Sequence, residues 1–191
     1  MTKAVFLDRD GTISEEVNYC RRAEDLHLIP LVTEAVNLLN RSGFKVIVVT
    51  NQSGIAREYF TLETLEQIHQ KMQDELAIGN AKVNAIYHCP HHPDDGCECR
   101  KPATGLLRKA SHDFNVNLEA SYMVGDRQTD VETGKAAGCK TVLVATGPDW
   151  ENGVSSHPDY IADNLMSAAR WIVSDSICQE FGNLLHTPAK S

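Results

Sequence analysis

The sequence of 191 residues lacks any long hydrophobic run, which bears on both membrane insertion and secretion. A membrane-spanning helix needs ~20 consecutive apolar residues, and the apolar stretches here are far shorter. The first of them, residues 4–7, ends at Asp8 and is too short for the hydrophobic segment of a signal peptide. We therefore expect a cytoplasmic protein without a membrane partner.

Positive charge is also scarce, because 18 Lys and Arg stand against 26 Asp and Glu, a formal net charge of −8. Proteins that bind nucleic acid present clusters of Lys and Arg, so this composition argues against a nucleic-acid partner. A small anionic ligand remains compatible with it. Internal repeats, low-complexity segments and linkers are missing too. Residues 1–191 are therefore expected to form one domain, with a monomer as the default expectation.

What the chain does have is an alternation of short apolar runs with amphipathic stretches. Continuous apolar runs are typical of buried parallel strands, and they occur at 4–7, 44–49, 83–88, 121–124 and 140–145. Helical spacing of apolar residues occurs at 31–41, 61–78, 106–114, 129–137 and 165–185. This alternation predicts a Rossmann-like three-layer α/β/α fold with a mainly parallel sheet.

The remaining segments are expected to be irregular. Residues 13–28 are predicted to form a loop or flap over the carboxyl edge of the sheet, 146–158 a loop, and 186–191 a frayed tail. Three isolated cysteines are expected to be buried, namely Cys20, Cys139 and Cys178. Five scattered histidines are expected at the surface, namely His27, His69, His112, His157 and His186.

Polar residues gather where three of the predicted strands end. Asp8 and Asp10 follow the first strand, Thr50–Gly54 the second, and Gly125-Asp126 a later one. Because the carboxyl ends of parallel strands meet at one edge of a sheet, these residues should converge on one crevice. Arg100-Lys101, after the third strand, would add two cations. For any one of these stretches an ordinary turn, or a solvated lysine, is the alternative.

The residue types in this crevice suit phosphoryl transfer. Neighbouring carboxylates repel one another, and a divalent cation with oxygen ligands such as Mg²⁺ relieves the repulsion. An aspartate can also act as a nucleophile that becomes an aspartyl-phosphate. Asp8 is the candidate nucleophile and Asp10, two residues later, the candidate acid and base.

In this order, the motifs resemble those of the haloacid dehalogenase (HAD) superfamily of phosphohydrolases, over about residues 5–144. The matching segments are 8–12, 50–51, 101 and 125–130. The resemblance implies that Asp8 attacks phosphorus, while Asp10 protonates the leaving group and then activates water. It also implies Mg²⁺ held by Asp8, the Asp10 backbone carbonyl and Asp126. Thr50 and Lys101 would stabilise the charge of the transferring group.

The gaps after the first and third motifs leave room for small loops and no large cap domain. A phosphomutase would need a site closed by a substantial cap, so hydrolysis is favoured. A zinc-stabilised binding module without catalysis is an alternative from a different class. It would require the loss of at least one catalytic residue, and all of them are present.

Three of the six cysteines fall within the eleven residues from Cys89 to Cys99. In a reducing compartment, clustered cysteines bind metal more often than they form disulfides. Three thiols and one imidazole make a closed tetrahedral zinc site, so we expect a structural zinc ion. The expected ligands are Cys89, His91, Cys97 and Cys99, with His92 outside the set; a disulfide or free thiols are the alternative. The loop 89–101 would then fix Arg100 and Lys101.

The cysteine loop and the segment Thr50–Arg57 resemble those of the D-glycero-D-manno-heptose 1,7-bisphosphate phosphatases. The resemblance implies removal of the C7 phosphate, in making nucleotide-activated heptose for surface polysaccharide. Histidinol-phosphate phosphatase, which shares the zinc loop, is the alternative function, with histidinol phosphate as the substrate. Arg100 is our candidate for clamping the second phosphate. Implied substrate contacts are Glu16, Val17, Asn18, Tyr19, Thr50, Asn51, Gln52, Ser53, Arg100, Lys101 and Arg127.

Overall fold

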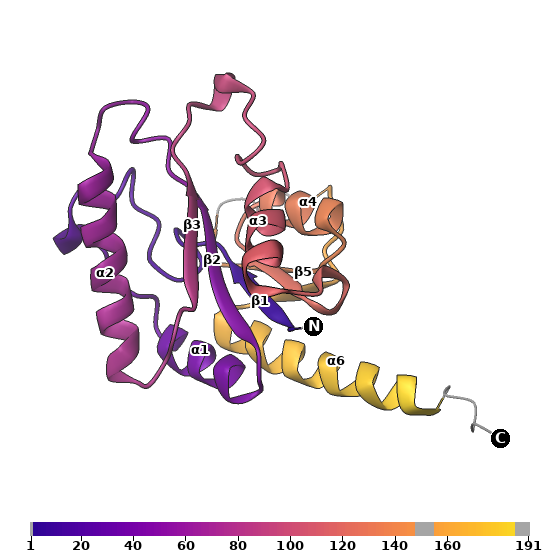
Figure 1. The fold of residues 1–191 in the computed structure, drawn as a ribbon. Coiled ribbons are helices and arrows are strands. Elements are labelled where there is room, and N and C mark those ends of the chain that lie inside the picture. Colours follow the sequence, from indigo (N-terminus) through magenta and orange to yellow (C-terminus); the bar gives the residue numbers. More distant parts are fainter. Residues whose placement is uncertain (1, 148–154, 186–191) are drawn as a thin grey trace.

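The computed structural model describes residues 2–147 and 155–185. Its centre is one sheet of six parallel strands in the order β3-β2-β1-β4-β5-β6. Figure 1 labels β1, β2, β3 and β5. The strands are β1 (Ala4–Leu7), β2 (Lys45–Asn51), β3 (Ala85–Cys89), β4 (Tyr122–Gly125), β5 (Lys140–Val144) and β6 (Tyr160–Ala162). The continuous apolar runs of β1 and β4 are explained by this arrangement, because these strands are covered on both faces and bury all their side chains.

Helices cover both faces of the sheet (Figure 1). The α-helices are α1 (Val32–Arg41), α2 (Leu62–Ile78), α3 (Gly105–Phe114), α4 (Gln128–Ala137) and α6 (Leu165–Leu185). Three short 3₁₀ helices are η1 (Ala23–Asp25), η2 (Pro93–Asp95) and η3 (Leu118–Ala120). Among the described residues, no helix is long and apolar enough to cross a bilayer.

Two hydrophobic cores lie on opposite faces of the sheet because side chains alternate along each strand. From β1, Val5 and Leu7 pack in the core covered by α1, α2 and α6. Ala4 and Phe6 pack in the other core, which α3 covers. The predicted three-layer α/β/α fold with a parallel sheet is confirmed.

The helix boundaries follow local chemistry. Thr61 precedes α2, and its side-chain oxygen accepts a hydrogen bond from the backbone N–H of Thr64 at 3.2 Å, the expected N-cap. Gly138 ends α4 in the left-handed conformation with φ of 85°, which glycine adopts at little cost. The helix predicted over 129–137 is therefore present, beginning one residue earlier.

The sequence did not predict β6. This strand at the sheet edge has three residues, and its apolar run is too short to indicate a strand; Tyr160 and Ile161 are exposed. Its position depends on a tertiary contact, because Asp159 accepts hydrogen bonds from the Thr141 amide and hydroxyl at 2.7 and 2.8 Å. Part of the loop predicted over 146–158 and the whole predicted tail 186–191 lie outside the described residues.

Two expectations about single side chains were wrong. Cys178 is exposed, whereas Cys20 and Cys139 are buried as expected. His69 is buried with 7% exposure rather than lying at the surface, because it is on the side of α2 that faces the sheet.

The strand order reverses next to β1, which pairs with β2 on one side and β4 on the other. In open parallel sheets, ligands bind at the carboxyl ends of the strands where such a reversal occurs. Asp8 follows β1 and Asp126 follows β4, so the fold places both carboxylates at this position.

Candidate active site

A buried cluster of three carboxylates lies at the carboxyl ends of β1 and β4. One oxygen each from Asp8, Asp126 and Asp130 lie within 4.8 Å of one another. The three residues are 7%, 0% and 1% exposed. Lys101 Nζ lies between two of them, 2.8 Å from Asp8 Oδ1 and 2.6 Å from Asp130 Oδ1. Asp130 Oδ2 also accepts a hydrogen bond from the Arg127 amide at 3.1 Å, so both its oxygens have partners.

Of the three carboxylates, Asp126 has the fewest partners to offset its negative charge. Among the described residues, neither of its oxygens has a hydrogen-bond partner, and Arg127 Nε lies 3.8 Å from Oδ2. Burial, followed by the charges of Asp8 and Asp130, raises the pKa of Asp126 to about 8. A cation that binds oxygen ligands would offset the repulsion between these carboxylates. Asp8 and Asp126 are the carboxylates placed to bind it.

Burial also raises the pKa of Asp8 to about 6, although Lys101 opposes the shift. For Lys101, burial alone would lower the pKa, but the charges of Asp130 and Asp8 outweigh it and raise the pKa. Lys101 is therefore a permanent cation against Asp8.

The packing around Asp126 leaves no room for larger neighbours. A Cβ atom on Gly11 would lie 2.3 Å from Asp126 Oδ2, and one on Gly147 would lie 2.1 Å from it. Gly11 also has φ of 78°, which disfavours other residues. The glycine after Asp10 therefore permits both the turn and the approach of the carboxylate from β4.

Asp10 is separate from the carboxylate cluster and is held by two other side chains. Arg9 Nε and Nη2 donate to its carboxylate at 3.1 and 2.8 Å, and Gln52 Nε2 donates to Oδ2 at 2.9 Å. Gln52 Nε2 also donates to the Thr50 hydroxyl at 2.8 Å. The ends of β1 and β2 are thus joined through Gln52.

A cavity of about 520 Å³ opens above these residues. All eleven predicted substrate contacts line it, together with Asp8, Arg9, Asp10, Cys20 and Thr129. At its edge, Arg127 Nη2 donates to Glu16 Oε2 at 3.0 Å, so the flap after β1 contacts the start of α4. Arg100 Nη1 is buried without a hydrogen-bond partner among the described residues. The cavity therefore combines carboxylates with an unpaired cationic donor, a combination suited to an anionic ligand.

The cysteine loop rises from the end of β3 (Figure 1). Cys89 Sγ lies 3.5 Å from Cys97 Sγ and 3.5 Å from His91 Nδ1. Cys99 Sγ lies 3.6 Å from Cys97 Sγ and 3.2 Å from His91 Nδ1. Tetrahedral zinc with bonds of ~2.3 Å to sulfur and ~2.0 Å to nitrogen would separate its ligand atoms by roughly 3.5–3.8 Å. The donor set and its spacing fit a four-coordinate metal ion. His92 lies outside it and caps η2.

Asn51 connects the end of β2 to Lys101, which follows the cysteine loop. Its Nδ2 donates to the Lys101 carbonyl and its Oδ1 accepts from the Lys101 amide, both at 3.1 Å. The backbone of Asn51 pairs with Cys89 in the sheet. Asn51 lines the cavity as predicted, but its amide group is used to hold Lys101.

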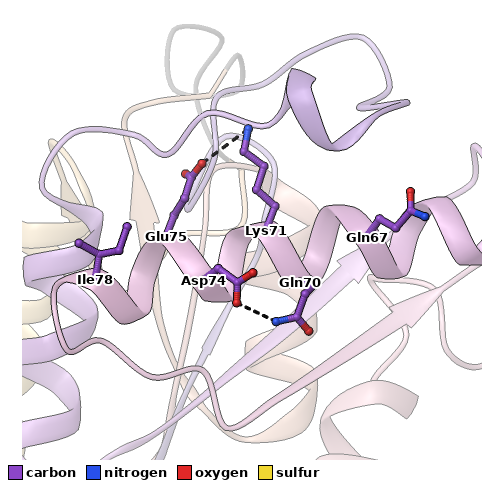
Figure 2. A pocket seen from close by; sticks show the side chains of 6 residues that line it. All are labelled: Gln67, Gln70, Lys71, Asp74, Glu75 and Ile78. Carbon is purple, nitrogen blue, oxygen red and sulfur yellow. Dashed lines mark hydrogen bonds and ion pairs between the residues drawn. The ribbon is translucent and has the colours of Figure 1, made fainter.

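A second hollow lies on the outer surface of α2, away from these residues (Figure 2). Its lining comes from one helix, and the side chains pair with each other, Gln70 with Asp74 and Lys71 with Glu75. Such pairs four residues apart are typical of a solvent-exposed helix face. The side chains that line this hollow do not form a metal-binding or catalytic cluster.

Known proteins resemble this chain over most of its length. A family model described as HAD-hydrolase-like matches residues 98–168. The D-glycero-D-manno-heptose-1,7-bisphosphate 7-phosphatase of Thermosynechococcus vestitus is 40% identical over 185 residues, covering 88% of this chain and 94% of that protein. The chain belongs to this phosphatase family. The D-glycero-beta-D-manno-heptose-1,7-bisphosphate 7-phosphatase of Pseudomonas putida is 38% identical over 174 residues, covering 90% of this chain and 99% of that protein.

Solved structures agree with this assignment. The D,D-heptose 1,7-bisphosphate phosphatase of B. bronchiseptica, solved with magnesium and phosphate, has a TM-score of 0.85 and 33% identity. The match covers 91% of this chain and 99% of that one. The resemblance found in the motifs, both to the HAD superfamily and to this phosphatase family, is confirmed.

Several side chains at the site or in contact with it were not predicted as members of it: Arg9, Cys20, Thr129, Asp130 and His69, whose Nε2 lies 3.3 Å from Arg9 Nη1. Asp130 was noted only as the end of the fourth motif, yet it is an ion-pair partner of Lys101. Arg9 lies between the two aspartates in sequence, which hinted at a role, but its 1% exposure depends on the fold. No feature of the sequence distinguished His69 from other histidines.

Proposed function

We propose that this protein is a phosphoric monoester hydrolase that removes the C7 phosphate of D-glycero-D-manno-heptose 1,7-bisphosphate. Its product would be used to make nucleotide-activated heptose for surface polysaccharide. The observation that carries the proposal is the placement of Asp8, paired with Lys101, and Asp10 beside one polar cavity. The names of the related proteins support the substrate.

The reaction would proceed in two displacement steps. In the first, an Asp8 carboxylate oxygen bonds to phosphorus, the bond from phosphorus to the C7 oxygen breaks, and Asp10 gives its proton to that oxygen. In the second, water attacks phosphorus, Asp10 accepts a proton from the water, and the bond to Asp8 breaks to release inorganic phosphate. Lys101 and the Thr50 hydroxyl would stabilise the charge of the transferring group.

Mg²⁺ would be held by Asp8, the backbone carbonyl of Asp10 and Asp126. The unpartnered buried oxygens of Asp126 fit this group, since they otherwise face two carboxylates. Bound Mg²⁺ neutralises negative charge on the phosphoryl group and its ligands. A structural Zn²⁺ would be held by Cys89, His91, Cys97 and Cys99, whose four donor atoms lie within 4.8 Å of one another.

The rest of the cavity would recognise the sugar and its second phosphate. Arg100 offers a guanidinium with an unpaired donor, suited to clamp the C1 phosphate. Arg127 and the flap residues Glu16–Tyr19 would contact the sugar. The enzyme would act as a single-domain monomer in the cytoplasm, without a nucleic-acid partner.

The proposal is tested by measuring phosphate release, with Mg²⁺ present, from both anomers of heptose 1,7-bisphosphate and from histidinol phosphate. We expect kcat/KM to be at least ~10²-fold higher for one heptose bisphosphate, since a monophosphate leaves the Arg100 donor unpaired. Faster hydrolysis of histidinol phosphate would overturn the substrate. Absence of phosphate release from all three would overturn the enzymatic function and favour a binding module.

A further inference from the structure

Arg9 is unusual among the charged residues because it is fully buried yet lies between the two candidate catalytic aspartates. Its exposure is 1%. One side of its guanidinium, Nε and Nη2, donates to the Asp10 carboxylate. The remaining nitrogen, Nη1, lies 3.3 Å from His69 Nε2. A guanidinium has five N–H donors and no acceptor, so each buried N–H needs an acceptor nearby.

His69 supplies an acceptor to Arg9 from a different element, the inner side of α2. Because arginine stays charged and only donates, the contact requires His69 Nε2 to be unprotonated, with the ring proton on Nδ1. Burial, followed by the charges of Arg9 and His88, lowers the pKa of His69 to about 3. His69 is therefore neutral at physiological pH and acts as a fixed acceptor.

Asp10 is thus held from two directions. Arg9, itself fixed by His69, donates to both carboxylate oxygens, and Gln52 at the end of β2 also donates to Oδ2 at 2.9 Å. The Asp10 side chain keeps 21% exposure toward the cavity. A general acid must meet the leaving oxygen at hydrogen-bond distance, so a small rotation of this carboxylate would reduce catalysis.

We propose that His69 is a positioning residue for the reaction: it fixes the Arg9 guanidinium, which in turn aims the Asp10 carboxylate at the leaving-group oxygen. This inference rests on the proposed function, in which Asp10 is the general acid. It adds a residue of α2 that lies outside the sequence motifs and does not line the cavity.

The test compares two substrates whose leaving groups need different amounts of acid catalysis. An alkoxide from a sugar phosphate must be protonated as it leaves, whereas 4-nitrophenolate is stable as an anion. Because kcat/KM reports the steps up to phosphoryl transfer, the ratio of kcat/KM for the two substrates isolates the contribution of Asp10 as an acid. The variants are His69→Leu, which removes the acceptor, and His69→Gln, whose side-chain oxygen can accept from Arg9.

For His69→Leu we expect kcat/KM to fall ~10-fold or more on heptose 1,7-bisphosphate and less than ~3-fold on 4-nitrophenyl phosphate. His69→Gln should recover most of the loss. His88→Leu is the matched control, because the His88 ring centre lies 6.1 Å from that of His69 and His88 is not bonded to Arg9. It should leave the ratio unchanged.

Equal losses on both substrates, no loss on either, or no recovery by His69→Gln would overturn the inference. If His69→Leu does not fold, His69→Phe, which keeps an aromatic ring but has no acceptor for Arg9, should shift the ratio in the same direction; an unchanged ratio there would overturn the inference. A wild-type protein inactive on every phosphate would overturn the proposed function itself. The two failures are therefore distinguishable.

Discussion

The two candidate metal centres of this protein are built in opposite ways. The carboxylate cluster joins Asp8 to Asp126 and Asp130 from more than a hundred residues further along the chain, and all three are buried. The cysteine cluster draws all its donors from eleven residues of one loop, and Cys97 and Cys99 are partly exposed. Oxygen donors suit hard cations such as Mg²⁺, while thiolates and imidazole suit zinc.

The two centres differ in what brings their ligand residues together. The sheet assembles the carboxylate cluster, so that cluster exists only in the folded protein. The cysteine loop has little regular structure of its own, so a bound metal would organise the loop. Asn51 joins the two regions, because it holds the Lys101 backbone beside Asp8. The following predictions test how far each centre depends on the other.

The largest effect is expected for Asp8→Asn. The amide is a poor nucleophile, so phosphate release should fall by ~10³-fold or more. Zinc content, measured by atomic absorption, should stay at the wild-type level because no zinc donor is altered. Loss of zinc in this variant would show that the cysteine loop depends on the carboxylate cluster.

The reverse dependence is tested by Cys99→Ser. Without this donor the loop should lose its metal, and the resulting shift of Arg100 and Lys101 should lower kcat/KM by ~10- to 100-fold. Cys178→Ser is the matched control, since Cys178 is exposed and outside the cluster. Full activity of metal-free Cys99→Ser would separate the two centres completely.

Asp126→Asn should stabilise the protein in the absence of Mg²⁺ while abolishing activity. An unpartnered buried carboxylate is costly, so we expect a gain of ~1–3 kcal/mol in the free energy of unfolding, measured with urea. Because the pKa of Asp126 rises from 3.8 to about 8 in the folded protein, its cost grows as the pH increases across that interval. The gain in the free energy of unfolding from Asp126→Asn should therefore also grow with pH over that interval.

Asp130→Asn is the matched control for that experiment. Asp130 is paired with Lys101 at 2.6 Å, so its replacement breaks a buried ion pair. This variant should lose stability where Asp126→Asn gains it. Equal effects of the two variants would contradict the distinction between the paired and the unpaired carboxylate.

The smallest effect is expected for Asn51→Ala, which removes the connection between the two regions. Losing two hydrogen bonds to Lys101 should lower the free energy of unfolding by ~1 kcal/mol and kcat/KM by ~10-fold. Zinc content should be unchanged. Asn51→Asp keeps the acceptor for the Lys101 amide but places a carboxylate oxygen against the Lys101 carbonyl, so it should lose at least as much as Asn51→Ala; wild-type stability in Asn51→Asp would argue against the bonding described here.

Sequence patterns predicted the alternating strands and helices because apolar runs and helical spacing are local features. They missed β6, since its apolar run of three residues is too short to indicate a strand. The family resemblance implied eleven substrate contacts, and all of them line one cavity. Sequence patterns did not reveal that Asn51 uses its amide on Lys101, which depends on how β2 and the cysteine loop meet.

By itself, the sequence determined which groups are available: two aspartates after a strand, a lysine after a cysteine loop, and a later aspartate. These follow from residue type and short spacing, which any fold of this class preserves. The tertiary structure decided which groups are paired. Burial and packing pair Lys101 with Asp8 and Asp130, and they leave Asp126 without a hydrogen bond and with only Arg127 at 3.8 Å. They also bring His69 of α2 to Arg9. Such long-range contacts depend on the packing of elements far apart in the chain, and short-range patterns do not encode that packing.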